Sequence, residues 1–141
     1  MKKVVFICHG NMFRSPIAKG FYDKYSEDGS SAFSYGTHVA EQGHEGMKLT
    51  CFPELGTYFL AAKKYGIDIE NYTCKQLKEE YLTDAGEIIV MAEKEYLPSY
   101  LSKYKYDYWE IPNPDFVTEK IAEDVISLIK EKVLELINKK V

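Results

Sequence analysis

Hydrophobic positions along this chain form short continuous runs, separated by segments in which they recur with helical spacing. Two runs, at residues 4–7 and 88–91, are unbroken and rich in β-branched side chains, which is typical of strands buried on both faces of a sheet. With Glu87 before it, the second run predicts a strand at residues 87–91. Shorter apolar and aromatic stretches at residues 32–35 and 106–111 predict two further short strands.

The segments between these runs carry helix signals. Ser15 and Pro16 follow the first run and are typical of a helix start, because proline fits the first turn of a helix. The stretch 55–65 has helical spacing and stops at Gly66, a residue suited to the position just past a helix end. Helices are also predicted at residues 93–103 and 121–137.

Strands that alternate with helices indicate parallel βαβ units. We therefore expect an α/β fold, a three-layer α/β/α sandwich with a four-stranded parallel sheet. No internal repeat, linker or composition shift interrupts the chain, so we expect a single domain spanning residues 1–141. Ligands of such sheets bind at the carboxyl ends of the strands. Cys8 directly follows the first apolar run, which places it at that edge.

Composition narrows the function classes. The formal net charge of −4 and the pI near 5.4 argue against nucleic-acid or membrane-surface binding, which favours a basic face. No apolar run approaches the roughly 20 residues of a membrane span, and the start of the chain lacks a signal-peptide cleavage site. The three cysteines fit neither a zinc pattern nor a paired disulfide framework, so we expect a reduced, cytoplasmic protein without metal or cofactor.

The segment CHGNMFRSP, residues 8–16, connects the first predicted strand to the first predicted helix. A strand, a tight turn and a helix N-terminus form an anion site, because backbone N–H groups converge there and the helix dipole adds positive charge. Gly10 and Asn11 tolerate the left-handed backbone that such a turn needs. Arg14 is the only arginine among 18 cationic residues, and its planar fork can grip two phosphate oxygens, unlike lysine.

The alternative interpretation of Cys8 is an inert buried thiol, since free cysteine is among the most buried residue types. The context favours a reactive thiolate instead. A strand precedes the loop, a glycine lies inside it and a Ser-Pro helix start follows it. The loop N–H groups would stabilise the thiolate, and Ser15 could donate a hydrogen bond to the sulfur. The segment therefore predicts an N-terminal phosphate-binding loop with a nucleophile.

This segment resembles the signature loop of low-molecular-weight protein tyrosine phosphatases, whose usual form is V-C-x-G-N-x-C-R-S-P at the N-terminus. The likeness extends along most of the chain. Residues 34–37 resemble the S-A-G-T segment of the family, residues 65–68 its G-I-D turn, and residues 84–91 its A-D-x-I-x-x-M strand. The signature loop is specific at this position, whereas each later segment alone is a weaker match.

The resemblance implies a role for each matching position. Cys8 would be the nucleophile that forms a cysteinyl-phosphate, and Arg14 would hold the equatorial phosphate oxygens together with the loop N–H groups. Asn11 would fix the loop through its side chain, and Ser15 would assist the thiolate. Phe13 occupies the position where the family often has a second, protective cysteine. The phosphate-binding residues are therefore expected to be His9, Gly10, Asn11, Met12, Phe13 and Ser15.

The chain departs from the family pattern at the general acid, which is an aspartate in an Asp-Pro-aromatic loop. Here Asn113 and Pro114 occupy the Asp-Pro position, and an amide cannot protonate a leaving group. Without a replacement, the rate would fall by about 10²–10⁴. One hypothesis is that Asp115 supplies the acid and Phe116 stacks on the substrate ring. The other is that Asp115 caps the last helix or lies in solvent.

These observations predict an enzyme, a cysteine-dependent phosphomonoesterase that acts on phosphotyrosine in a protein or on an aryl phosphate, and that also accepts inorganic phosphate or a similar oxyanion. It would be impaired if Asn113 has no substitute. His38, Asn113 and Phe116 are expected to line the substrate cleft beside Met12 and Phe13. One alternative is a phosphate- or phosphotyrosine-binding module with lost turnover. Another is an arsenate reductase, which the resemblance disfavours because no extra cysteine lies near residues 90–91.

Overall fold

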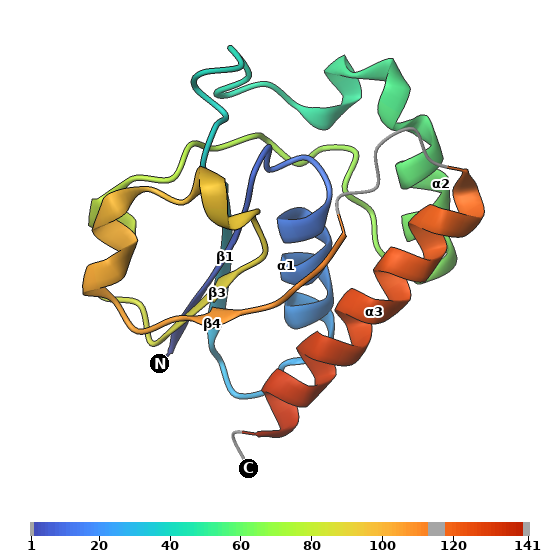
Figure 1. Cartoon of the computed structure of the whole chain (residues 1–141). Coiled ribbons are helices and arrows are strands. Elements are labelled where there is room, and N and C mark those ends of the chain that lie inside the picture. The colour runs from blue at the N-terminus through green and yellow to red at the C-terminus, as the bar shows by residue number, and fades with distance from the viewer. Residues whose placement is uncertain (1, 113–117, 140–141) are drawn as a thin grey trace.

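The computed structural model describes residues 2–112 and 118–139 and contains the expected parallel sheet (Figure 1). Four strands, β1 (Lys3–Cys8), β2 (Ser31–Gly36), β3 (Glu87–Val90) and β4 (Asp107–Tyr108), are arranged in the order β2-β1-β3-β4. All three neighbouring pairs are parallel. The four-stranded parallel sheet predicted from the apolar runs is therefore confirmed.

Three α-helices share the hydrophobic core on one face of this sheet, α1 (Arg14–Tyr25), α2 (Gly56–Lys64) and α3 (Glu119–Asn138). Helix α1 packs against β1 and β2, α3 packs against α1, and α2 packs against α3. Figure 1 shows α3 as the long C-terminal helix alongside α1. The strand residues Val4, Phe6 and Ile89 point to these helices and are completely buried. From α3, the buried stripe comprises Ala122, Val125, Ile126, Ile129, Val133 and Leu136.

Short 3₁₀ helices cover the opposite face. The alternate strand residues Val5, Ile7 and Val90 pack there against Leu82 and Leu101. The covering elements are η3 (Glu79–Tyr81), η4 (Lys94–Tyr96) and η5 (Ser99–Lys103), while η1 (Leu49–Cys51) and η2 (Pro53–Leu55) precede α2 on the other side. The third layer of the expected sandwich is therefore present, but it consists of 3₁₀ helices and connecting segments.

The single helix predicted at residues 93–103 is wrong in its type. Pro98 divides the segment into η4 and η5, and it has extended backbone angles, φ −67° and ψ 149°. Proline has no N–H to continue a helix, and it disfavours helical geometry in the residue before it. Leu97 is extended as well, with φ −79° and ψ 130°.

The other helix boundaries agree closely with the sequence signals. The first helix begins at Arg14, one residue before the predicted Ser-Pro start, and α2 ends just before Gly66, whose φ of 77° is the left-handed geometry expected after a helix end. Thr118 caps α3 by accepting a hydrogen bond from the Ile121 N–H.

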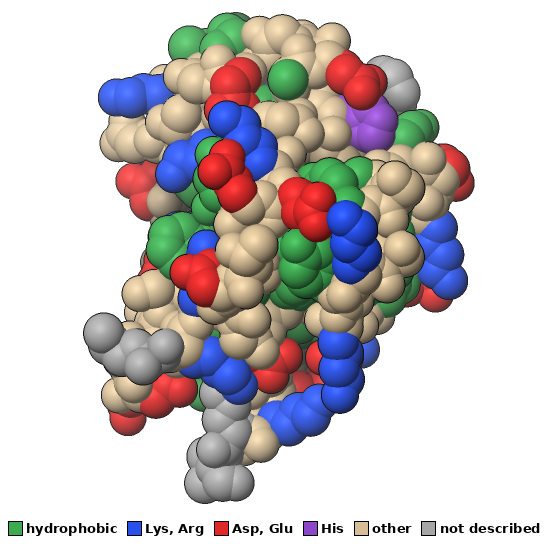
Figure 2. All heavy atoms as spheres, turned by 90° about the vertical axis from the view of Figure 1, so that its left-hand side faces the viewer, with side chains coloured by type: hydrophobic (Ala, Val, Ile, Leu, Met, Phe, Trp, Pro, Cys, Tyr) green, Lys and Arg blue, Asp and Glu red, His purple; other side chains and the backbone are tan. Residues whose placement is uncertain are grey.

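The surface carries both signs of charge. Figure 2 shows acidic and basic side chains interspersed with hydrophobic ones on one face, without a broad field of either sign. Within residues 2–112 and 118–139, no helix combines the length and apolar character needed to cross a membrane.

Candidate functional site

The phosphate-binding loop predicted from the sequence lies at the carboxyl edge of the sheet. Cys8 is the last residue of β1 and Arg14 is the first residue of α1, so the intervening loop joins a central strand directly to a helix N-terminus. The two side chains are only 2% and 3% exposed. Burial of a guanidinium requires charged or polar partners, and those partners define the site.

The Cys8 sulfur has hydrogen-bond partners on two sides. The Asn11 backbone N–H donates to Sγ at 3.3 Å, so the loop turns back over the sulfur. The Ser15 hydroxyl lies 3.0 Å from the same atom, and it can donate to a thiolate. The sulfur therefore lies between a backbone donor of the loop and a hydroxyl of the first helical turn.

The Asn11 side chain fixes the shape of the loop. Asn11 is completely buried and has a φ of 56°, the left-handed geometry predicted for this position; Gly10 does not adopt it. Its Nδ2 donates to the hydroxyls of Ser15 at 2.9 Å and Ser34 at 2.6 Å, and it lies 3.5 Å from the Tyr72 hydroxyl. Its Oδ1 accepts from the backbone N–H of Lys75 at 2.8 Å. One amide therefore links the loop to three other segments.

The end of β2 supports the loop from the side. The Thr37 N–H donates to the Cys8 carbonyl at 2.9 Å, and the His38 N–H donates to the His9 carbonyl at 3.0 Å. A Cβ on Gly36 would lie 2.8 Å from both the Asn11 nitrogen and the His9 oxygen. The backbones approach so closely here that only glycine fits.

Arg14 is held along one edge of its guanidinium. NH1 and NH2 form two bonds to the Glu93 carboxylate, at 3.2 and 3.1 Å. NH1 also donates to the carbonyls of Met91 at 2.7 Å and Ile111 at 3.1 Å. Within the described part of the chain, the edge formed by Nε and the second NH2 hydrogen has no acceptor. That edge has the fork geometry suited to two oxygens of one oxyanion.

The ion pair affects the protonation of Glu93. Burial acts to raise the pKa of this carboxyl. The hydrogen bonds and charge of Arg14, a backbone hydrogen bond and the charge of His9 together outweigh burial and lower the pKa below its usual value. Glu93 is therefore charged at neutral pH and keeps Arg14 in place.

Three aromatic rings lie beside the loop. The His9 ring centroid is 4.7 Å from that of His38 and 4.3 Å from that of Tyr96. Burial and the neighbouring His38 lower the pKa of His9, with a smaller opposing effect from Glu93. His38 also contacts Thr37, whose Oγ1 is 2.8 Å from Nδ1. His38, expected in the substrate cleft, is therefore brought next to the loop.

The remaining predicted site residues fall into two groups. Phe13 is 5% exposed and stacks on Tyr58, so its side chain belongs to the core; Met12 is half-buried against that core. Asn113, Asp115 and Phe116 lie outside the described residues.

Sequence reasoning missed three residues that hold the site together. Ser34 and Tyr72 act on the loop from segments far away in sequence, and the Tyr72 hydroxyl donates to the Ser34 carbonyl at 2.8 Å. Glu93 follows the strand predicted at 87–91. An acidic residue just past the carboxyl end of a central strand could have been predicted from the sequence as a site residue. Tyr72 lies in an irregular segment and had no such signal.

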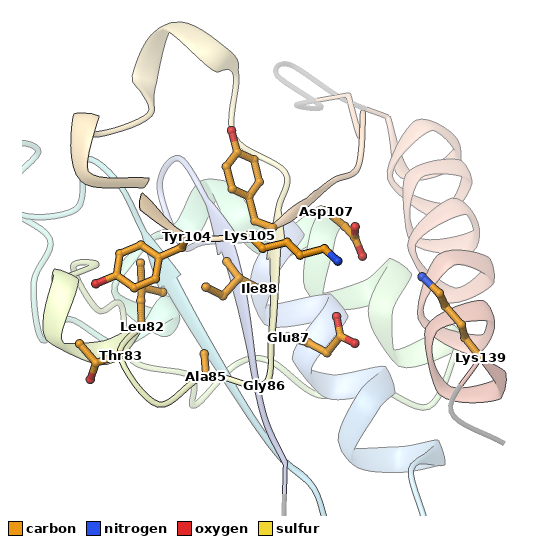
Figure 3. Close-up of a pocket in the computed structure, with 11 residues that line it drawn as sticks. Leu82, Thr83, Ala85, Gly86, Glu87, Ile88, Tyr104, Lys105, Asp107 and Lys139 are labelled. Atoms are coloured by element: carbon orange, nitrogen blue, oxygen red, sulfur yellow. The ribbon is translucent and has the colours of Figure 1, made fainter. Parts of the chain in front are cut away.

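A hollow of about 420 Å³ opens at the opposite edge of the sheet (Figure 3). It lies at the amino ends of β3 and β4, where Glu87 and Asp107 begin the two strands. Figure 3 shows Tyr104 on one side and Lys139, the residue that follows α3, on the other. The hollow lies at the other edge from Cys8, which ends β1 at the carboxyl edge, so it is separate from the loop of residues 8–14.

Other proteins share this architecture. A family model described as low molecular weight phosphotyrosine protein phosphatase matches residues 3–141. Among solved structures, Vibrio vulnificus Wzb in complex with benzylphosphonate is 20% identical, with 98% of both chains covered and a TM-score of 0.82. The low molecular weight protein tyrosine phosphatase from T. tengcongensis is 24% identical, with 99% of both chains covered and a TM-score of 0.78.

An arsenate reductase in the phosphate binding state is 25% identical, with 99% of this chain and 98% of the reductase covered and a TM-score of 0.76. The search of curated proteins found no match.

Proposed function

We propose that this chain, which belongs to the low molecular weight phosphotyrosine protein phosphatase family, hydrolyses phosphotyrosine in proteins or another aryl phosphate through a cysteinyl-phosphate. One observation carries the proposal. Cys8 and Arg14 flank a loop at a helix N-terminus, with donors aimed at the sulfur and one edge of the guanidinium without an acceptor among the described residues.

In the first step, the Cys8 thiolate attacks the phosphorus of the bound monoester. The S–P bond forms while the bond from phosphorus to the leaving oxygen breaks, and that oxygen takes a proton from a general acid. Asn11 and Ser15 hold the thiolate before attack through their hydrogen bonds to Sγ, at 3.3 and 3.0 Å.

Charge on the transferred phosphoryl group is stabilised by Arg14 and by the loop N–H groups. Glu93 contributes by holding the opposite edge of the guanidinium. Because Arg14 is already fixed by Glu93 and two carbonyl oxygens, it loses little conformational freedom when the oxyanion binds.

In the second step, water attacks the phosphorus of the cysteinyl-phosphate. The P–S bond breaks, inorganic phosphate leaves, and the Cys8 thiolate is regenerated. The residue that protonated the leaving group in the first step now takes the proton from water.

We assign the acid role to Asp115, two positions after Asn113 in the sequence, and a stacking role to Phe116. The proposal rests on the chemistry of the sequence, since an amide at position 113 cannot donate a proton and Asp115 is the nearest carboxyl group on its C-terminal side.

Asn113 also supports a second candidate function, a phosphotyrosine-binding module that retains the loop but turns over slowly. An arsenate reductase has weaker support. Such chemistry needs further reactive thiols, and burial, together with the neighbouring Cys8, raises the pKa of Cys74 to about 11. Cys74 is therefore a neutral thiol near pH 7, which is a poor nucleophile.

The test is steady-state hydrolysis of a phosphotyrosyl peptide as a function of pH. We would compare the natural sequence with Asp115→Asn, using Cys8→Ser as the blank. The proposal expects a bell-shaped profile whose acid-dependent limb disappears in Asp115→Asn. Turnover that is unchanged in Asp115→Asn removes this residue from the mechanism. No turnover above the Cys8→Ser blank would contradict the phosphatase proposal and favour the binding module.

A further inference from the structure

The rings beside the loop form a continuous surface that the hydrolytic scheme does not use. His9 belongs to the loop, His38 follows β2, and Tyr96 ends η4. The ring centroids are 4.3 Å apart for His9 and Tyr96, 4.7 Å for His9 and His38, and 5.0 Å for His38 and Tyr96. We call His9, His38 and Tyr96 the three-ring surface. It begins at the residue that follows the nucleophile.

This surface is accessible and has acidic neighbours. Tyr96 is 38% exposed, which is unusual among the large hydrophobic side chains of the described residues. The Glu41 carboxylate lies 3.7 Å from His38 Nε2, and its side chain is 74% exposed. Glu41 and Glu93 both act electrostatically on His9, so carboxylates flank the rings from two different segments.

The cations of the chain near this surface are engaged elsewhere. Arg14 is bound to Glu93. Lys94, close to Tyr96 in sequence, has its Nζ 5.1 Å from the ring centroid of Tyr108. The lowered pKa of His9 keeps this ring neutral at neutral pH, so it does not repel an incoming cation. Within the described residues, no lysine or arginine lies over the Tyr96 ring.

We propose that the three-ring surface and Glu41 form a subsite for a lysine or arginine side chain that neighbours the phosphorylated residue of a protein substrate. Aromatic faces attract cations, and an adjacent carboxylate adds Coulomb attraction. The phosphate bound in the loop and the Glu93 carboxylate add further negative charge, which Arg14 offsets only in part. This inference rests on the proposed function, since it requires the loop to bind the phosphorylated residue of the substrate.

The test uses pairs of phosphotyrosyl peptides. The two peptides of a pair differ only in having lysine or alanine at one position near the phosphotyrosine, and the pairs cover the two positions on each side of it. We would measure kcat/KM for the natural sequence and the Kd of the same peptides for Cys8→Ser. Glu41→Gln removes the carboxylate, and Glu131→Gln on α3 is the matched charge control. Tyr96→Leu removes the ring, whereas Tyr96→Phe keeps it.

We expect lysine at one position or more to raise kcat/KM and peptide affinity by about fivefold, with the advantage falling as salt is added. Glu41→Gln and Tyr96→Leu should bring the lysine-to-alanine ratio close to one, while Glu131→Gln and Tyr96→Phe retain it. Equal affinity for lysine and alanine peptides at every position overturns the subsite, as does a ratio unchanged in Glu41→Gln. If the natural sequence shows no turnover, the phosphatase proposal fails, and the Kd ratios still decide the subsite.

Discussion

At the scale of single residues, Asn11 is a small side chain on which the geometry of the loop depends. It is completely buried and joins the loop to Ser15, Ser34 and Lys75. Replacing it with alanine removes the hydrogen bonds to these partners. It also places alanine at φ 56°, where asparagine is tolerated because its side chain forms local hydrogen bonds that alanine lacks. We expect Asn11→Ala to lower the free energy of unfolding by about 2–4 kcal/mol and kcat/KM by about 100-fold. Urea unfolding and phosphotyrosyl-peptide hydrolysis measure the two effects.

Ser34→Ala is the milder comparison. It removes a hydroxyl that accepts from the Asn11 amide and donates to the Ser15 hydroxyl, but it keeps the Asn11 side chain and its hydrogen bonds to Ser15 and Lys75. Its loss should therefore be the smaller of the two in both measurements. Equal losses would mean that the left-handed backbone at Asn11 adds nothing to the cost of Asn11→Ala in stability or activity.

Tyr72 supports the loop indirectly, through Ser34, whose hydroxyl accepts from Asn11. The Tyr72 hydroxyl donates to the Ser34 carbonyl at 2.8 Å, and burial raises the pKa of this phenol well above its usual value. The phenol therefore stays protonated, and can donate, at neutral pH. Tyr72→Phe should cost about 1–2 kcal/mol of unfolding free energy, because the ring stays and the hydrogen bond is lost. Thermal unfolding measures this cost, and an unchanged Tm would show that water replaces the hydroxyl.

The residues of the candidate site that lie within one short segment were accessible to prediction from the sequence. Cys8, Asn11, Arg14 and Ser15 could be predicted because the strand, loop and helix that position them are continuous in the chain. Tyr72 could not, because it reaches the loop from an irregular segment about 60 residues away. Its role depends on how that segment passes β2, which no local pattern encodes.

At the scale of elements, the meeting of β2 and the loop depends on Gly36. A Cβ there would be 2.7 Å from Val39 Cγ2 and 2.8 Å from two backbone atoms, which cannot move independently of the site. We expect Gly36→Ala to cost at least about 2 kcal/mol of unfolding free energy and to impair turnover. Urea unfolding, with peptide hydrolysis on the same preparation, checks both.

Gly56 provides the matched control. It is the first residue of α2, its φ is −54°, and a Cβ there would meet no atom within 4 Å. Gly56→Ala should therefore stabilise the protein by about 0.4–1 kcal/mol, mainly by restricting the unfolded chain. If both alanines have the same effect, the close approach at Gly36 is not what limits this position.

Strand prediction succeeded at this scale because the apolar runs are buried on both faces of the sheet. Residues 4–7 are completely buried, with alternate side chains in each of the two hydrophobic clusters. The helix predicted at 93–103 failed because helical spacing of apolar residues does not reveal what a single proline does. Pro98 converts one expected helix into two 3₁₀ helices, and this places Tyr96 beside His9.

At the scale of the whole molecule, the shifted pKa values predict a pH range in which the free energy of unfolding is highest and constant. Burial acts to raise the pKa of Glu93, but Arg14, a backbone hydrogen bond and His9 together lower it from 4.5. The contribution of Glu93 to stability is therefore present above pH 4.5 and is lost as the pH falls through its folded value. The pKa of Cys74 is raised from 9.0 to about 11 by burial, so the unfolded state releases a proton first and stability falls above pH 9.

His9 should set the acid end of this optimum. Burial and His38 lower its pKa from 6.5, against smaller opposing effects of Glu93 and Glu41, while Arg14 lowers it further. The unfolded state therefore binds the proton more readily, and stability must fall as the pH drops below 6.5. We expect the free energy of unfolding in urea to be flat between pH 6.5 and 9. In His9→Phe, which keeps a ring against Tyr96, the flat range should extend toward pH 4.5. A slope between pH 5 and 6.5 that survives in His9→Phe would assign this acid limb to other groups.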